Sequence, residues 1–251
     1  MLGNGDSYMS IEVFNRYEKK YILDKDIYMN FKKEIEGYME PDKHNKDGNI
    51  YTISNIYYDT VNNDLITRSI QKPPYKEKLR LRGYGAPKYE DMVFLEIKKK
   101  YDGIVNKRRS SMKLCEALKM LESGRMEEIQ PYMNEQIIRE IEYMLSNHEI
   151  IPALYLAYDR YAYFDVNNKD FRLTFDFNVR SRREDLDLSK GDYGELLFDE
   201  DTVIMEMKAT HAVPLWFARL LSKYKLYPIS VSKYGTEFKK NLLENISERN
   251  D

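Results

Sequence analysis

Alternating apolar and polar residues along several segments of the chain predict β-strands. In the clearest, 170–180, the odd-numbered residues from Phe171 to Val179 are apolar and the residues between them are polar or charged. Successive side chains of a strand point to opposite faces, so this period predicts one apolar and one polar face. The same alternation predicts strands over 11–21, 76–84, 92–100, 104–110, 154–164 and 202–209, and the β-rich segment 50–58 adds another.

Helical spacing of apolar residues is confined to fewer segments. Between Asp24 and Met39, Ile27, Phe31 and Ile35 recur at the spacing of an amphipathic helix, with Asp24 as its N-cap. Further helices are predicted over 113–122, 132–146, 215–223 and 233–245. The pattern predicts a single α+β domain over residues 1–251, with an antiparallel sheet of about eight strands, peripheral helices and a helical insertion at about 112–150.

Composition excludes several classes of protein. The 251 residues contain 40 Lys+Arg and 42 Asp+Glu, for a net charge of -2, and no apolar run approaches the roughly 20 residues that span a bilayer. The single Cys115 excludes a disulfide framework and fits a reducing compartment. Met1–Ser10 has no signal-peptide pattern, so we expect a cytoplasmic location.

The polar faces of the predicted strands are unusually basic. Arg80 with Arg82, and Lys98 with Lys100, are close pairs of cations on one face, whereas Lys99 should point the other way. A solvated outer face is the ordinary interpretation of such a pattern. Neighbouring cations on one face repel each other, however, unless an anion lies among them.

Taken together, the candidate face residues carry an excess of eight positive charges in a protein of net charge -2. If all face one side, they form a positive field that attracts an anionic substrate. Buried cations are too costly without counter-charge, so an anion must then lie among them. The basic members are Arg16, Lys20, Lys78, Arg80, Arg82, Lys98, Lys107, Arg109, Arg160, Arg172, Lys208 and Lys233, and the acidic members are Glu18, Glu96, Asp176 and Glu206.

Other residues receive structural interpretations. No Gly-x-x-x-x-Gly-Lys loop is present, which excludes a P-loop enzyme. Trp216 is interpreted as core packing, and Tyr57 and Asp59 as strand-end packing and a turn. None of the histidines lies in a motif, and His44 is interpreted as an ordinary surface residue.

A succession of short segments resembles the VTC domain, the polyphosphate polymerase branch of the CYTH-like triphosphate tunnel metalloenzymes. The resemblance runs from about residue 10 to 240. The segments are Arg16-Tyr-Glu-Lys-Lys-Tyr21, Tyr57-Tyr-Asp-Thr60, Lys78-Leu-Arg-Leu-Arg82, Phe94-Leu-Glu-Ile-Lys98, Lys107-Arg-Arg109, Arg160-Tyr-Ala-Tyr-Phe164, Arg172-Leu-Thr-Phe-Asp176, Met205-Glu-Met-Lys208 and Ser230-Val-Ser-Lys-Tyr-Gly235.

The resemblance implies an eight-stranded antiparallel β tunnel or barrel with a charged lumen that binds a triphosphate with Mn²⁺ or Mg²⁺. It implies transfer of the γ-phosphate of ATP to a growing polyphosphate chain, so the expected partners are ATP and inorganic polyphosphate and not nucleic acid. Relatives are tethered to transmembrane segments, so such coupling would here require a separate membrane-protein partner. The oligomeric state and the choice of metal stay open.

Roles for individual residues follow from the resemblance by position. The residues expected to act on the transferred phosphates are Lys20, Arg80, Arg82, Lys98, Arg160, Arg172 and Glu206. Further phosphate or nucleotide contacts are expected from Arg16, Lys78, Lys107, Arg109, Lys208 and Lys233. The expected metal ligands are Glu206, Glu18 and Glu96.

One departure separates the possible activities. Hydrolytic and cyclase branches begin with Glu-x-Glu-x-Lys, and here Arg16 stands at the first position, before Glu18 and Lys20. Loss of a carboxylate weakens the triphosphatase or cyclase alternative. A non-catalytic polyphosphate-binding module is the other alternative, and Glu206 counts against it. Glu206 with Lys208 could also be a cross-strand pair without function.

Overall fold

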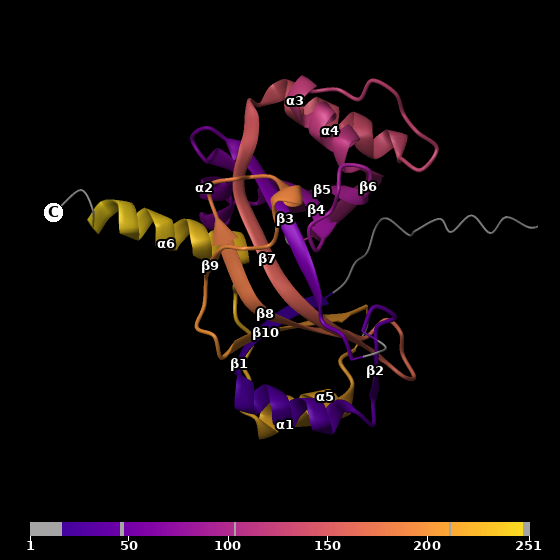
Figure 1. The fold of residues 1–251 in the computed structure, drawn as a ribbon. Helices are drawn as coiled ribbons and strands as arrows, with labels where there is room; N and C mark the ends of the chain where they lie inside the picture. Colours follow the sequence, from indigo (N-terminus) through magenta and orange to yellow (C-terminus); the bar gives the residue numbers. More distant parts are fainter. Residues whose placement is uncertain (1–16, 46–47, 103, 211, 248–251) are drawn as a thin grey trace, which may run out of the picture.

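One antiparallel sheet organises the computed structural model, which describes residues 17–247 except 46–47, 103 and 211 (Figure 1). The predictions for Arg16 and His211 therefore lie outside the described residues. The strands are β1 (Tyr17–Asp24), β2 (Met39–Pro41), β3 (Tyr51–Thr60), β4 (Tyr75–Tyr84), β5 (Met92–Tyr101), β6 (Ile104–Lys113), β7 (Ile150–Asp165), β8 (Arg172–Arg182), β9 (Glu195–Leu196) and β10 (Thr202–Ala209).

The strand order confirms the predicted antiparallel sheet of an α+β fold, but the sheet is not closed. The continuous path is β1-β10-β8-β7-β3-β4-β5-β6, and the short strands β2 and β9 pair with β7 and β8 outside this path. The eight strands of the path are those predicted from the sequence. In the described part of the chain no pairing joins the two end strands, β1 and β6, so hydrogen bonds do not close the expected tunnel.

The helices are α1 (Lys25–Ile35), α2 (Asp64–Ile70), α3 (Leu114–Ser123), α4 (Glu135–Asn147), α5 (Leu215–Lys223) and α6 (Lys233–Ser247). All but α2 were predicted. The N-cap at Asp24 is confirmed, because its side chain accepts a hydrogen bond from the backbone N–H of Ile27. No helix within the described residues is long and apolar enough to cross a membrane.

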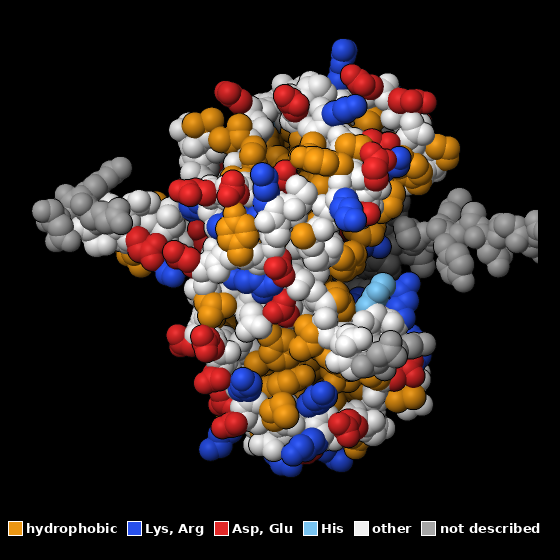
Figure 2. Space-filling view, in the orientation of Figure 1, with side chains coloured by type: hydrophobic (Ala, Val, Ile, Leu, Met, Phe, Trp, Pro, Cys, Tyr) orange, Lys and Arg blue, Asp and Glu red, His pale blue; other side chains and the backbone are white. Residues whose placement is uncertain are grey.

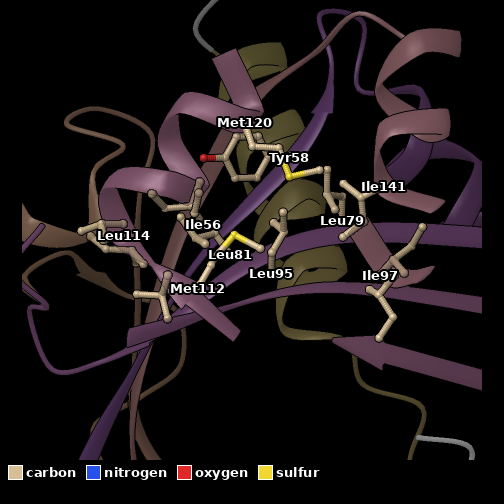
Figure 3. Close-up of a cluster of buried hydrophobic side chains, with 14 of the residues drawn as sticks. Ile56, Tyr58, Leu79, Leu81, Leu95, Ile97, Met112, Leu114, Met120 and Ile141 are labelled. Carbon is tan, nitrogen blue, oxygen red and sulfur yellow. The ribbon is translucent and has the colours of Figure 1, made fainter. Parts of the chain in front are cut away.

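Two apolar cores cover the outer face of the sheet. One lies under α3 and α4, where Leu81, Leu95 and Ile141 are completely buried (Figure 3). The other lies under α1 and α5 and is built on aromatic residues such as Phe31 and Phe217. In Figure 1 these helix pairs lie at opposite ends of the molecule. Each half of the sheet is thereby held rigidly from outside.

A third core lies on the inner face. Ile204 is in phase with Glu206 along β10, yet it is buried with Tyr234 and Phe238 from the first turns of α6. Helix α6 therefore covers part of the face that the charge pattern marks as interior, and its far end projects away from the sheet (Figure 1). The first turns of this helix therefore bury part of the inner face.

The alternation predicted for 170–180 is broken near its end. Phe171 and Phe175 lie in the outer core as predicted, but Val179 lies in the inner core. Asn178 has a positive φ of 46°, and the register with β7 shifts between Ala157 and Asp159. A bulge of this kind inserts one extra residue and reverses the faces beyond it, so the prediction for Val179 was wrong.

Candidate functional site

Strands β4, β5 and β6 form one charged wall of the interior. On β4, Arg80 and Arg82 alternate with Leu79 and Leu81, whose side chains are completely buried in the outer core. Arg80 is paired in register with Glu96 of β5. The pairs Glu96 with Arg109 and Lys98 with Lys107 continue the wall onto β6. Packing of the leucines outside thus fixes the arginines inside.

Strands β1, β10, β8 and β7 form the other charged wall. Their register pairs are Lys20 with Glu206, Lys208 with Arg172, and Arg160 with Asp176. Directly opposed residues of antiparallel strands share a face, so these six side chains point into the same interior. Lys99, on the outer face of β5, instead lies 3.8 Å from Glu140 of α4, as its predicted outward direction requires.

The two walls face each other across the interior. Burial lowers the pKa of Lys98 on β5, the carboxylates of Glu18 and Glu206 act to raise it, and the ammonium of Lys20 acts to lower it. Coulombic interactions weaken with distance, so these side chains lie near one another across the interior, although β5 and β1 are not paired. The charged side chains of sequentially distant strands thus converge, as predicted.

Glu96 is the centre of one cation cluster. Its carboxylate is 2% exposed and accepts hydrogen bonds from Arg80, at 2.9 Å from Nε, while Lys107 Nζ lies 2.7 Å from Oε1. Arg82 Nε lies 3.8 Å away. Burial favours the neutral acid, but Arg80, Arg82 and Lys107 together hold the pKa of Glu96 well below its usual range.

Asp176 is the centre of a second cluster. It is completely buried and accepts two hydrogen bonds from Arg160, at 2.6 and 2.8 Å, and one from Lys233 at 2.6 Å. Despite burial, these two cations lower the pKa of Asp176. The sequence placed Asp176 on the charged face but assigned it no role. Its alternation with Arg172 was the signal available.

Glu206 lies beside the second cluster and makes fewer contacts. Lys208 Nζ is 2.6 Å from its Oε1 atom. Burial opposes ionisation, yet the cations Lys208, Lys20, Arg160 and Lys233 hold the pKa of Glu206 well below its usual range. The carboxylate is therefore ionised inside a cationic environment.

Two tyrosines contact the clusters, and Tyr57 is half-buried whereas Tyr158 is buried. Arg80 donates to the hydroxyl of Tyr57 at 3.2 Å, and Arg82 donates to the hydroxyl of Tyr158 at 3.4 Å. Lys233 lies 4.5 Å from the centre of the Tyr158 ring. Burial raises the pKa of Tyr57, but Arg80 and Lys78 together outweigh it, so the net shift is downward. Sequence reasoning assigned Tyr57 to strand-end packing and missed this position.

Arg109 takes a different position among the predicted residues. Its side chain is exposed and its guanidinium lies 4.7 Å from the centre of the Phe94 ring. Arg172 approaches Asp42 at 3.2 Å, and its Nε atom makes no hydrogen bond within the described residues. The same holds for the buried hydroxyl of Thr174, which is opposite Glu206 in the register. The Arg172 Nε–H and the Thr174 hydroxyl can therefore donate hydrogen bonds to ligand oxygens.

Charge is segregated between interior and surface. The described interior gathers ten of the predicted basic side chains against five acidic ones, Asp42 included, so five positive charges are uncompensated. Figure 2 shows, by contrast, basic and acidic side chains interspersed over the outer surface of the face in view. The ten basic residues are Lys20, Lys78, Arg80, Arg82, Lys98, Lys107, Arg160, Arg172, Lys208 and Lys233, and the remaining acidic residues are Glu18, Glu96, Asp176 and Glu206.

The carboxylates do not form a ready-made metal cage. Across the described ranges, no three His, Cys, Asp or Glu side chains gather as a metal-binding group. Glu96 lies on β5 of one wall and Glu206 on β10 of the other, and the Glu96 carboxylate already binds Arg80 and Lys107. Mg²⁺ is commonly held by one or two carboxylates together with substrate phosphates, and Glu206 with Glu18 nearby fits that arrangement.

Comparison with known families gives one match that spans most of the chain. The family described as the VTC domain matches residues 15–241. No curated protein matches the chain. The family match covers both charged walls and the first part of α6.

Solved structures share the fold at low sequence identity. A candidate adenylate cyclase from Bacillus halodurans is 16% identical with a TM-score of 0.54, over 88% of this chain and 96% of its own. A candidate adenylyl cyclase from Hippeastrum, described as having a dominant triphosphatase activity, is 15% identical with a TM-score of 0.54, over 86% of this chain and 92% of its own. At these identities the likeness concerns the fold.

Proposed function

We propose, from the premise that this chain belongs to the VTC domain family, that it is a metal-dependent phosphotransferase acting on ATP and polyphosphate. In this function it moves the γ-phosphate of ATP onto the end of a polyphosphate chain. The observation that carries the proposal is the interior with five uncompensated positive charges. Buried cations without counter-charge are costly, and a polyanion would supply the missing charge.

The chemistry suits such an interior. Phosphoryl transfer requires positioning and charge neutralisation more than covalent participation by the protein. Arginine presents a planar fork to two phosphate oxygens, whereas lysine supplies a point charge. Glu96 and Asp176 already orient Arg80 and Arg160, so little reorganisation accompanies binding. The ionised end of polyphosphate is itself the nucleophile.

We assign roles by residue type. Arg80, Arg82, Arg160 and Arg172 would hold the triphosphate in line, with Lys20, Lys98, Lys107 and Lys208 neutralising its charge. Glu206 would hold Mn²⁺ or Mg²⁺ bound to the phosphates, assisted by Glu18. When bound, the ion would supply further charge neutralisation at the phosphate oxygens. Glu96 is better suited to orienting arginines than to holding a metal, because Arg80 and Lys107 occupy it.

Two alternatives remain part of the test. The triphosphatase named for the Hippeastrum protein favours hydrolysis of short triphosphates on the same fold. A polyphosphate-binding module without turnover would use the same cations. Cytoplasmic location and a separate membrane partner remain predictions of the sequence.

Incubation of the purified protein with ATP and Mn²⁺ distinguishes these functions. We expect polyphosphate chains and ADP, resolved by gel electrophoresis and nucleotide chromatography. Free phosphate without chains would replace the proposal by hydrolysis. Tight polyphosphate binding without turnover would leave only the binding module.

Arg80→Ala should weaken tripolyphosphate binding at least tenfold, because a charge-assisted contact is lost. Unchanged binding would contradict the role of Arg80.

A further inference from the structure

Aromatic side chains gather at one end of the interior. Tyr84 is the next inward position after Arg82 on β4, and Phe94 is paired in register with Arg82. Tyr51 of β3 is paired in register with the inward residue Arg160. Because the strands are antiparallel, the start of β3, the end of β4 and the start of β5 lie at the same end of the sheet.

The rings form a contiguous group. Tyr84 has ring-centre distances of 5.9 Å to Tyr51 and 6.2 Å to Phe94. His44, from the segment before β3, lies 5.7 Å from Tyr51 and 6.1 Å from Tyr84, inclined at 22° to the Tyr84 ring. The Arg109 guanidinium covers Phe94 at 4.7 Å.

Two rings of this group are open to solvent, whereas Tyr51 and Phe94 are half-buried. Tyr84 is 45% exposed, and His44 is also exposed. By contrast, Tyr234 and Phe238 of α6 are buried in the inner core. The near-parallel His44 and Tyr84 rings are also more widely spaced than the stacked pair Tyr38 and Trp216, whose centres are 4.6 Å apart. The exposed rings of Tyr84 and His44 therefore have π-surface available to a ligand, with Tyr51 and Phe94 behind them.

The aromatic group adjoins the phosphate-binding cations. Tyr84 follows Arg82 by two residues, which is about 7 Å along a strand. Burial raises the pKa of Tyr51 to about 12, and the nearby cations Arg160 and Arg172 limit that rise. A ligand with several phosphates on the arginines would therefore place its next group against these rings.

We propose that His44, Tyr51, Tyr84 and Phe94 form a stacking platform for the base of a nucleoside triphosphate. The platform rests on the proposed function, since it assumes that the phosphates occupy the cationic interior. It fixes the direction of the ligand, with the base at this end and the phosphates on the neighbouring arginines Arg82 and Arg160. Stacking tolerates any base, because every base has a π-face, so the platform selects nucleotides over inorganic triphosphate rather than one nucleotide over another.

Paired ligands separate the platform from the phosphate site. ATP and ribose 5-triphosphate carry the same sugar and phosphates and differ only in the base. We expect the wild-type protein with Mg²⁺ to bind ATP about tenfold more tightly than ribose 5-triphosphate by titration calorimetry. Tyr84→Ala should remove this preference and leave ribose 5-triphosphate binding within twofold. Tyr84→Phe, which keeps the ring, should retain the preference.

Two further variants complete the experiment. His44→Ala, in an exposed position, should reduce the preference for ATP even if Tyr84→Ala fails to fold. Tyr143→Ala removes a ring that is 72% exposed on α4 and should change neither affinity. Equal binding of both ligands by the wild type, or equal weakening of both by Tyr84→Ala, would overturn the platform and leave the proposed function standing. Binding of neither ligand by the wild type would overturn both.

Discussion

Glu206 shows how surroundings decide the chemistry of one carboxyl group. It is buried, yet Lys208, Lys20, Arg160 and Lys233 keep it ionised. Glu206 and Lys208 both lie on β10, so the cross-strand pair considered from the sequence is a pair within one strand. A pair without function would require only Lys208. The additional cations keep the carboxylate ionised, so it can also bind a metal ion that is held by the phosphates of a ligand.

We expect Glu206→Gln to abolish turnover while nucleotide binding partly survives. The amide keeps the shape of the side chain but removes the charge that attracts the metal ion, and the cations that bind phosphate remain. Turnover and nucleotide affinity should be measured on the same preparation. Glu40→Gln, at an exposed carboxylate paired with Lys169, is the matched control. Full activity of Glu206→Gln would remove Glu206 from the metal role.

Lys107 should couple phosphate binding to proton uptake. Burial lowers its pKa to about 7; Glu96 acts to raise it, and Arg82 and Arg80 lower it further. Its side chain remains 39% exposed, so a ligand can reach it. Phosphate oxygens favour the charged ammonium and raise this pKa in the complex. Affinity for tripolyphosphate should therefore fall as the pH rises above about 7.

Calorimetry at pH 8 in two buffers of different ionisation enthalpy measures this uptake. Lys107→Arg keeps the charge at all pH values, so it should reduce the uptake by close to one proton. Lys78, whose pKa burial lowers to about 8, should supply the remaining uptake. The same uptake in the wild type and the variant would show that Lys107 is already protonated in the free protein.

At the scale of elements, the short helix α2 links the sheet to α6. Asp59, completely buried at the end of β3, accepts hydrogen bonds from the backbone N–H groups of Leu65 and Ile66 at 2.8 and 3.0 Å. It also accepts one from the Tyr234 hydroxyl at 2.9 Å. Tyr234 follows Lys233, so this carboxylate helps to place the ammonium that binds Asp176. The predicted turn at Asp59 is therefore a structural connection to the site.

Asp59→Ala should lower the free energy of unfolding by about 3 kcal/mol, since it leaves three buried donors without an acceptor. Chemical denaturation followed by circular dichroism measures the change. Asp64→Ala removes an exposed carboxylate from the first turn of α2 and should lower the free energy of unfolding by less than about 1 kcal/mol. Equal effects of the two substitutions would contradict the connecting role of Asp59.

At the scale of the whole molecule, the net charge of -2 conceals a separation of charge by face. Adjacent lysines of β5 illustrate it. Lys98 points into the interior between the two walls, and Lys99 points outward to Glu140 on α4. The apolar cores outside the sheet keep these faces apart, because turning β5 over would bury Glu96 and Lys98 in an apolar core and move Ile97 into the charged interior.

Lys98→Gln and Lys99→Gln change the net charge equally and should differ in effect. We expect Lys98→Gln to weaken tripolyphosphate binding about tenfold, since a charge in a shielded interior is lost. Lys99→Gln should change it less than twofold, because its half-buried pair with Glu140 lies on the outer face, away from the ligand. Titrations at two salt concentrations measure both effects. Equal weakening would show that overall charge governs binding.

The sequence by itself determined the strands of the main path, most helices and the side of each strand on which charge lies. Local alternation carries that information, because the period of two assigns each residue to a face without reference to other strands. It also sufficed for Lys99 pointing outward. The apolar neighbours of Trp216 predicted its packing against the outer core, where its ring stacks on Tyr38.

Only the tertiary structure decided which charges meet. That Glu96 holds Arg80 and Lys107, that Asp176 holds Arg160 and Lys233, and that α6 covers part of the inner face depend on register and on contacts between distant strands. The bulge at Asn178, the short helix α2 and the position of Tyr57 beside Arg80 were missed for the same reason. A periodic pattern fixes a face, whereas pairing partners are chosen by the packing of the whole sheet, which no local segment encodes.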